Sequence, residues 1–415
     1  MDNVTHALAG LLLADATVLA LTPRGVAVDR RFLRRARSAS ALANNLPDLD
    51  FVLRGLTPGR VGYLLHHRGH SHTLPVALAL GAIAFGVLAR LWRAPLSRER
   101  WTLLTLCCLG PWVHIAMDFS NNYGVHPFWP LHDGWFYGDA VFIVEPLFWV
   151  LTIPALALAS PARAMGFLLW GILLVGLGLA WVTDFADRGT ALFLTLVALG
   201  FSAVNLRLAP RARTTVAVLG SLAVALLFFA MSHAARVAVA QASLSGTPEH
   251  GQRLELVDTS LAPAPSNPFC WSAMSVGQQS GRYVLLVATV ALVPSLISLE
   301  RCAVEPTGRS LALHLPELES TPRVRWDGEW TAPLTELGAL FRGDCEARAY
   351  LRWARLPFWF APRRGTLFLG DIRYDRDRGL DFAETVGTSP PRTCPKRVPP
   401  WTPPRGDLMN PPVGP

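Results

Sequence analysis

The chain has 415 residues, of which 51% are hydrophobic and only 16% are charged. About a quarter of the residues of a soluble domain are charged. The composition therefore excludes an ordinary soluble protein and indicates a polytopic membrane protein with an added polar part. The net charge of +8 comes almost wholly from arginine. In membrane proteins such a surplus marks cytoplasmic loops, and no DNA-binding motif is visible, so we expect no nucleic-acid partner.

The N-terminus, MDNVTHALAG, carries Asp2 and no basic segment, so we expect no cleavable signal peptide and a first apolar segment that is retained with His6. Including a weaker segment, 38–56, which holds a proline and two aspartates, we expect about 7–8 membrane segments. The apolar runs long enough to cross a bilayer are 4–22, 74–92, 102–118, 140–159, 165–183, 190–206 and 215–240.

Arginines cluster in every second connection between these segments, at 24–37, 90–100, Arg163 and 207–213. The positive-inside rule makes these connections cytoplasmic. The connections 57–73, 119–139 and 184–189 then face outward, and so does everything after residue 240. This alternation requires segment 38–56 to cross the membrane once, as a broken or half-inserted helix.

The region after the last span has a different pattern. Residues 241–386 show short alternations of apolar and polar residues and many turn residues, which predicts a small β-rich domain. Stretch 283–299 fits a buried strand pair or an eighth span, and its β-branched residues favour strands. Residues 387–415 are proline-rich, which predicts a disordered tail. In an oxidising compartment, one or two disulfides are expected among Cys270, Cys302, Cys345 and Cys394. The expected fold is thus an α-helical polytopic membrane bundle, residues 1–240, with a β-rich extracytoplasmic domain.

Ionisable residues inside membrane segments are costly and usually functional, and here the topology brings them to one face. They come from the first span, the weak segment, the first outer loop, the end of the third span and the second outer loop. They are His6, Asp48, Asp50, His66, His67, His70, His72, His114, Asp118 and His126.

Their spacing suits metal binding. His114 and Asp118 are four residues apart on a helix, so their side chains share a face. Asp48 and Asp50 follow a proline, and His67 and His72 lie five apart in a glycine-containing loop. Imidazole and carboxylate ligands suit zinc, and also manganese or iron. Such an ion lowers the pKa of bound water to about 7.

Each of these residues also has an interpretation that does not involve a metal. A single histidine at this depth is more often a polar residue at the level of the headgroups than a ligand. Asp48 and Asp50 can cap a helix, and the stretch HHRGHSHTL can be a pH-sensitive or lipid-facing loop. The combination of all these residues at one face favours a metal site.

The order His6, LPDLD, HRGHSH and HxxxD followed by NNYG resembles the YdjM-like family of inner-membrane proteins, which are described as predicted metal-dependent hydrolases, with some members linked to the LexA regulon. The resemblance covers about residues 1–150 by motif. The family pattern is closer to H-R-G-x-T-H-S, so His66 and His70 are additional here and the resemblance favours His67 and His72 as ligands. It implies a bacterial inner-membrane location.

The order His6, Asp48, His67, His114 and Asp118 is also distantly similar to the zinc clusters of zinc-dependent phospholipase C and P1-type nucleases. This similarity implies a bridging role for Asp118 and phosphate esters as substrates. The second HxxxD of those enzymes has no counterpart here.

The leading hypothesis is a membrane-embedded, metal-dependent hydrolase acting at the outer face on a phosphoester or a lipid or envelope substrate. Its metal ligands would be His6, Asp48, Asp50, His67, His72, His114 and Asp118, with His66 and His126 as further candidates. Asp48, Asp118 and Arg68 are the candidate catalytic residues. The rival hypothesis is a non-enzymatic protein, either an envelope-stress scaffold or a metal-ion carrier.

Three further residues have two interpretations each. Arg68 could bind a substrate phosphate bidentately or anchor its loop to lipid headgroups. Asp139 and Glu145 could orient a ligand histidine, although ordinary polarity at a helix end is the simpler explanation. The expected partners are membrane lipids and a small-molecule or lipid substrate.

Overall fold

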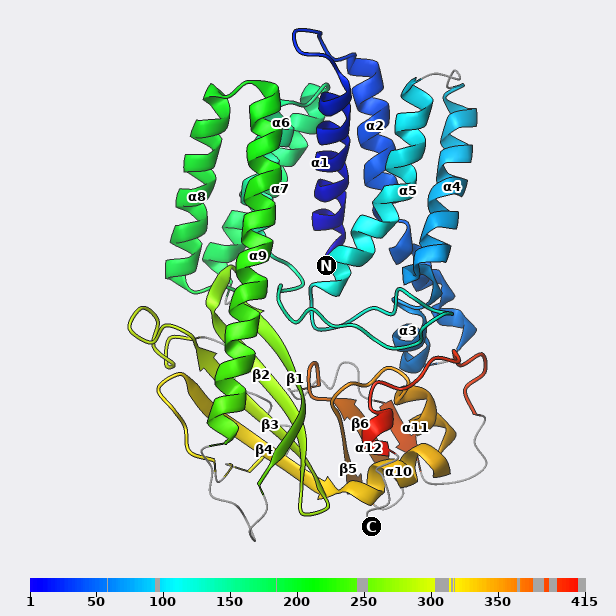
Figure 1. Ribbon diagram of the computed structural model, residues 1–415, viewed down its shortest axis with the longest axis vertical. Coiled ribbons are helices and arrows are strands. Elements are labelled where there is room, and N and C mark those ends of the chain that lie inside the picture. Colours follow the sequence, from blue (N-terminus) through cyan, green and yellow to red (C-terminus); the bar gives the residue numbers. More distant parts are fainter. Residues whose placement is uncertain are drawn as a thin grey trace.

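The computed structural model describes residues 1–57, 59–93, 98–183, 185–244, 253–302, 313–314, 316, 318–363, 366–375, 384–387 and 394–409. In these residues a bundle of apolar helices stands on a region of β-strands (Figure 1). Six helices are long and apolar enough to cross a membrane, so the chain is a multi-pass membrane protein. They are α1 (Asn3–Leu21), α4 (Leu74–Leu91), α5 (Arg98–Phe119), α7 (Arg163–Val182), α8 (Arg188–Arg207) and α9 (Pro210–Ser243).

Two of the predicted segments form shorter helices. In place of 140–159, α6 runs over Pro146–Leu158, because Glu145 caps it and Pro146 begins it. In place of 38–56, the chain forms α2 (Arg30–Ala43) and then a 3₁₀ segment, η1 (Pro47–Leu56). Among the described helices, six therefore meet the length and composition of a span.

The expectation that the arginines of residues 24–37 all lie in a loop is wrong, because α2 begins at Arg30. Arg37 is buried on α2 and donates to Asp15 of α1, with Nε–Oδ1 and Nη2–Oδ2 distances of 2.6 and 2.5 Å. It also donates to the carbonyl oxygen of Leu156 on α6. A buried carboxylate on the neighbouring helix is what lets this guanidinium leave water.

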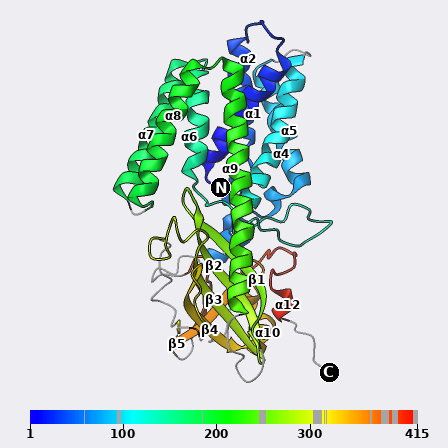
Figure 2. The ribbon, with the colours of Figure 1, turned by 60° about the vertical axis from the view of Figure 1, so that its left-hand side comes forward.

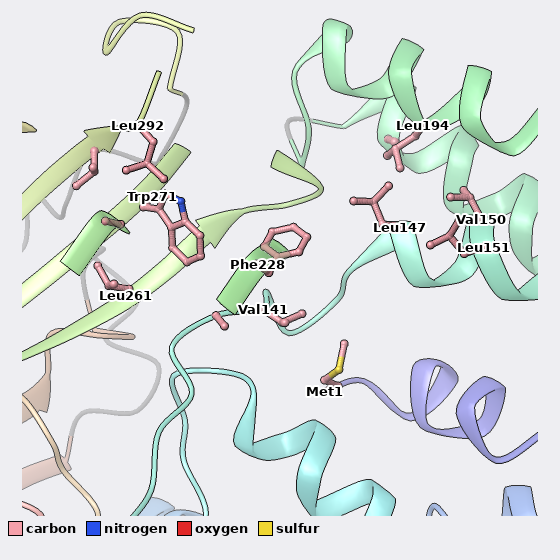
Figure 3. Packing of buried hydrophobic residues seen from close by; sticks show 14 of the residues in the cluster. Met1, Val141, Leu147, Val150, Leu151, Leu194, Phe228, Leu261, Trp271 and Leu292 are labelled. Carbon is pink, nitrogen blue, oxygen red and sulfur yellow. The ribbon is translucent and has the colours of Figure 1, made fainter. Parts of the chain in front are cut away.

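The longest helix connects the bundle to the β-region. The 34 residues of α9 make a helix about 50 Å long, which exceeds the roughly 30 Å of a bilayer core. Figure 2 shows α9 continuing from the bundle along the strands. Phe228 of α9 packs edge-on against Trp271 of the sheet and lies beside Val141 (Figure 3). One hydrophobic core thus passes through both regions, and the predicted boundary at residue 240 falls inside α9.

The strands behind α9 form an antiparallel sheet in the order β1-β2-β3-β4. Their bounds are Glu255–Ala264, Asn267–Gln279, Arg282–Ala291 and Val324–Pro333. Stretch 283–299 is therefore not an eighth span. It contributes one strand, β3, followed by a turn, rather than a strand pair, because β2 and β4 supply its two partners.

The rest of the C-terminal region holds two short helices, α10 (Leu334–Gly343) and α11 (Cys345–Tyr350), and a second sheet in the order β5-β6-β7. Its strands are Pro357–Arg363, Thr366–Asp371 and Glu384–Gly387. Disulfides join Cys270 to Cys302 and Cys345 to Cys394.

The prediction of a disordered tail is wrong for residues 394–409. The Cys345–Cys394 disulfide anchors this segment, Trp401 is buried, and a short helix, α12 (Gly406–Met409), packs on α10. Residues 388–393 and 410–415 lie outside the described part of the chain.

Candidate metal centre

Four potential ligands meet where the bundle joins the β-region. They are Asp48 of η1, His72 of a short 3₁₀ turn, η2 (His70–His72), and His114 and Asp118 of α5. One ligand atom from each lies within 4.8 Å of the others. His114 and Asp118 share a face because they are one helical turn apart. His72, His114 and Asp118 are fully buried.

The distances match a coordination shell. The Nε2 atoms of His72 and His114 lie 3.1 Å apart, and they are 3.2 and 3.3 Å from Oδ2 of Asp118. Oδ1 of Asp48 is 3.6 Å from His72 Nε2 and 3.4 Å from His114 Nε2. Neighbouring ligands bonded at about 2.0–2.1 Å to a tetrahedral ion lie about 3.3 Å apart.

The outer nitrogen of each imidazole is already engaged. His114 Nδ1 lies 2.7 Å from the carbonyl oxygen of Asn44. A carbonyl only accepts, so the proton is on Nδ1 and the lone pair of Nε2 faces the cluster. His72 Nδ1 lies 3.2 Å from Oδ2 of Asp50, which directs its Nε2 in the same way. An imidazole held by a carboxylate or carbonyl in this manner is typical of metal ligands.

Oδ2 of Asp118 is a buried carboxylate oxygen for which the described residues provide no hydrogen bond. Such an atom is costly unless a positive charge lies next to it. It faces the Nε2 atoms of His72 and His114. The residues therefore fit a divalent cation, because a cation would bond all of these atoms at once.

Electrostatics around His72 also favour a cation. Burial alone would lower the pKa of His72, but its contacts with Asp118, Asp48 and Asp50 outweigh burial and raise it to about 10. Burial would likewise raise the pKa of Asp48, whereas its contacts with His114 and His72 hold it well below its usual range. A field that stabilises a proton here also attracts a metal ion, which would displace that proton.

A second, overlapping group consists of Asp48, Asp50 and His67. His67 Nδ1 lies 3.1 Å from Asp50 Oδ1. Oδ2 of Asp50 accepts hydrogen bonds from the Arg68 backbone N–H and the Ser71 hydroxyl, both at 2.8 Å. Asp50 is thus more fully hydrogen-bonded than Asp48. This arrangement suits an orienting role for Asp50 better than a role as a primary ligand.

His6 and Arg68 contact the other oxygen of Asp118. The ring of His6 stacks on His114 at 3.7 Å, and its Nε2 is 3.3 Å from Oδ1 of Asp118. Arg68 donates to the same oxygen at 2.8 Å and to Oδ1 of Asn121 at 2.9 Å. The guanidinium of Arg68 is buried, so the idea that it anchors the loop to headgroups is wrong. It fixes the carboxylate of Asp118 instead.

Besides His6, two further predicted ligands, His66 and His126, lie outside both groups. His66 Nε2 is 3.0 Å from the hydroxyl of Thr57, because α3 (Arg60–His66) turns this side chain away from His67. His126 is buried between Trp135 and Trp401, with ring centroids 4.7 and 4.3 Å away. His70 packs on Trp129 and Trp401. His66 contacts Thr57, and His70 and His126 pack against the loop after α5 and the C-terminal segment, rather than facing the cluster.

Asp139 and Glu145 contact no ligand histidine among the described residues. Asp139 is paired with Arg355 and Arg236. Glu145 caps α6 and accepts hydrogen bonds from Ser266 in the β1–β2 turn. The simpler explanation, polarity at a helix end, is confirmed for Glu145, which in addition connects the bundle to the sheet.

The sequence interpretation missed several residues that shape the centre. Asn44 acts on His114 through its backbone carbonyl, for which no sequence signal exists. Asn121 accepts from Arg68 and also from the backbone N–H of Tyr123. Its place in the NNYG stretch, which begins three residues after the Asp118 of HxxxD, is the signal that could have identified it.

Comparison with known proteins places this centre in a family. No curated protein and no solved structure matches the chain. The model of the YdjM inner membrane protein family matches residues 1–186, a range that contains every residue of the two groups. The part of the chain that holds the candidate metal centre is therefore similar to the YdjM inner membrane protein family.

Proposed function

We propose that the protein is a metal-dependent hydrolase embedded in the inner membrane, with its centre at the outer face, acting on a phosphoester or a lipid or envelope substrate. The observation that carries the proposal is the convergence of His72 Nε2, His114 Nε2 and Asp48 Oδ1 on the unpartnered Oδ2 of Asp118. Zinc is the preferred ion for this mixture of ligands, and manganese or iron also suit it.

A divalent ion in this place would acidify a bound water and polarise the ester. His72, His114, Asp118 and Asp48 would hold the ion, and Asp50 and the Asn44 carbonyl would keep the imidazoles in the required tautomer. Arg68 would keep Asp118 in place. Hydrolysis of a phosphoester adds the hydroxyl of water to phosphorus, breaks the P–O bond to the alcohol and gives the departing oxygen a proton.

The fully buried ligands leave one side for a substrate. The side chain of Asp48 is 13% exposed, and that of His67, which belongs with Asp48 to the second group, is 18% exposed. Asp48 is therefore the ligand nearest to an incoming molecule.

Two features support placing the centre outside the cytoplasm. Arginines gather at the helix ends that face the α1–α2, α4–α5, α6–α7 and α8–α9 connections, and these helix ends lie at the end of the bundle remote from the strands (Figure 1). The positive-inside rule assigns that end to the cytoplasm. The two disulfides of the C-terminal region fit an oxidising compartment at the opposite end.

The test is hydrolysis by the full-length protein in detergent, stripped by chelator and reloaded with Zn²⁺ or Mn²⁺. The assay uses bis(p-nitrophenyl) phosphate and short-chain phospholipids. We expect metal-dependent turnover that is lost in Asp118→Asn and kept in His132→Ala, which alters an exposed histidine outside the cluster. Metal binding without turnover on any of these esters would support a carrier or scaffold instead.

A further inference from the structure

The side chains of the 3₁₀ segment η1 form three rows that differ in exposure. The segment has about three residues per turn, so residues three apart share a side. Asp50 and the half-buried Leu53 lie on the inner side. Leu49 and Val52, with exposures of 53% and 64%, lie on the outer side. The third ridge holds Asp48 and Phe51, so a half-exposed phenyl ring follows the same edge as the most exposed ligand of the first group.

The position of η1 in the bundle fits a site at the membrane boundary. Three residues separate the end of α2 from η1, whose Asp48 contacts His114 near the end of α5 and His72 just before α4. This level is the end of the bundle that meets the strands (Figure 1). Exposure of Leu49, Phe51 and Val52 to water is unfavourable in proportion to their apolar area. Exposure to lipid at this depth removes that penalty.

The polar neighbours of η1 fit the same position. Arg54 follows the apolar residues and is exposed. Arginine at the edge of a bilayer extends toward headgroup phosphates while its alkyl part stays in the apolar layer. A segment with apolar residues on its outer side and an arginine at its end is suited to lie in the interface.

We infer that η1 is inserted in the outer headgroup layer and that the substrate is a membrane lipid, which reaches the metal centre sideways past Phe51 and Asp48. This inference rests on the proposed hydrolase function and narrows its substrate class. The bond to be cleaved would be an ester or phosphoester near the junction of head and tails, because that part of a lipid lies at the depth of Asp48. The tails would stay in the bilayer beside Leu49 and Val52.

The first experiment locates η1 without any assay of activity. Nitroxide labels are placed singly at Leu49→Cys and Val52→Cys in full-length protein in proteoliposomes, with Cys107 and Cys108 replaced by serine. Leu226→Cys on α9 serves as the lipid reference and Arg323→Cys as the water reference, since both positions are exposed. We expect the η1 labels to resemble Leu226→Cys, with high accessibility to oxygen and low accessibility to a nickel chelate. Labels that resemble Arg323→Cys would overturn the inference, whatever the protein hydrolyses.

The second experiment separates lipid entry from catalysis. Leu49→Glu/Val52→Glu is compared with the wild type, and Leu49→Ser/Val52→Ser is a milder version in case the first does not fold. We expect unchanged metal content, at least a tenfold loss of turnover on phospholipid in vesicles, and turnover on bis(p-nitrophenyl) phosphate within about twofold of wild type. Equal loss on both substrates, or no loss on vesicles, would overturn lateral entry. A wild type inactive on every ester would instead refute the hydrolase function, while the label data would still report where η1 lies.

Discussion

Oδ2 of Asp50 lies 3.2 Å from Nδ1 of His72. This contact orients the ring so that its other nitrogen, Nε2, faces His114 and Asp118. The two residues lie on separate 3₁₀ segments, η1 and η2, which touch only because α3 folds the intervening chain back. This contact converts two short motifs, LPDLD and HSH, into one side of the centre. It also predicts that Asp50 matters for metal affinity without being a primary ligand.

Replacement Asp50→Asn removes the charge that polarises His72 while keeping the shape of the side chain. We expect the dissociation constant for Zn²⁺ to rise about 10–100-fold, the usual effect of losing such an orienting contact. Competition with a chelator of known affinity measures it. Asp133→Asn, at a carboxylate that contacts Thr402 rather than any ligand, is the control. Equal affinity in Asp50→Asn and wild type would contradict the assigned role.

The side chain of Arg355 connects the loop between α5 and α6 to the sheet. It is buried and bonds to Asp139 at 2.8 Å and to Asp258 of β1 at 2.8 Å. Arg355→Ala leaves two carboxylates short of a partner, so we expect a loss of about 3–5 kcal/mol in unfolding free energy. Arg325→Ala breaks a half-exposed pair with Asp327 and should cost no more than about 1 kcal/mol. Denaturant unfolding in detergent compares them, and similar losses in both variants would contradict this account.

Glu145 makes the bundle–sheet junction sensitive to pH. Burial raises its pKa to about 7, against the opposing effect of hydrogen bonds from Ser266 and Leu147. The folded state then binds a proton more tightly than the unfolded state. Its contribution to stability is complete below pH 4.5 and is lost as pH rises through 7, by on the order of 3 kcal/mol.

The measurement is the unfolding midpoint at pH 5 and pH 8 for the wild type and Glu145→Gln. Because many groups titrate, only the difference between the two proteins is informative. We expect the wild type to lose more stability than Glu145→Gln on going to pH 8. Parallel pH profiles would mean that Glu145 is ionised in the folded state throughout this range.

The cysteines report on the compartment of the C-terminal region. Protein alkylated in denaturant without reduction should label at Cys107 and Cys108, the two free cysteines, and after reduction at all six. Protein taken directly from cells should already show this pattern if the region lies outside the cytoplasm. Six labelled cysteines before reduction would contradict the outward orientation.

Part of this centre could be predicted from the sequence because helical geometry is local. The spacing of four between His114 and Asp118 places both on one face of any helix, and the structure confirms that they meet. Asp48 and His72 could be named as candidates because carboxylates and imidazoles are costly near a membrane interior. Their exact partners depend on the fold between them, which no spacing encodes.

Other features depended on contacts between distant residues. His66 and His126 have the same chemistry as His72, and only the turn of α3 and the packing of Trp401 remove them from the cluster. The burial of Arg37 depends on Asp15 in another helix. Strand order also follows from pairing over long separations, so the alternating pattern predicted strands but not their partners.

The central claim is that His72, His114, Asp118 and Asp48 hold a divalent metal. Elemental analysis of detergent-purified protein, prepared without chelators, tests it most directly beside the His114→Ala/Asp118→Ala double variant and His132→Ala. The account predicts about one zinc, manganese or iron ion per chain in the wild type and in His132→Ala, and none in the folded double variant. Metal-free wild-type protein, or a double variant that retains its metal, would contradict it.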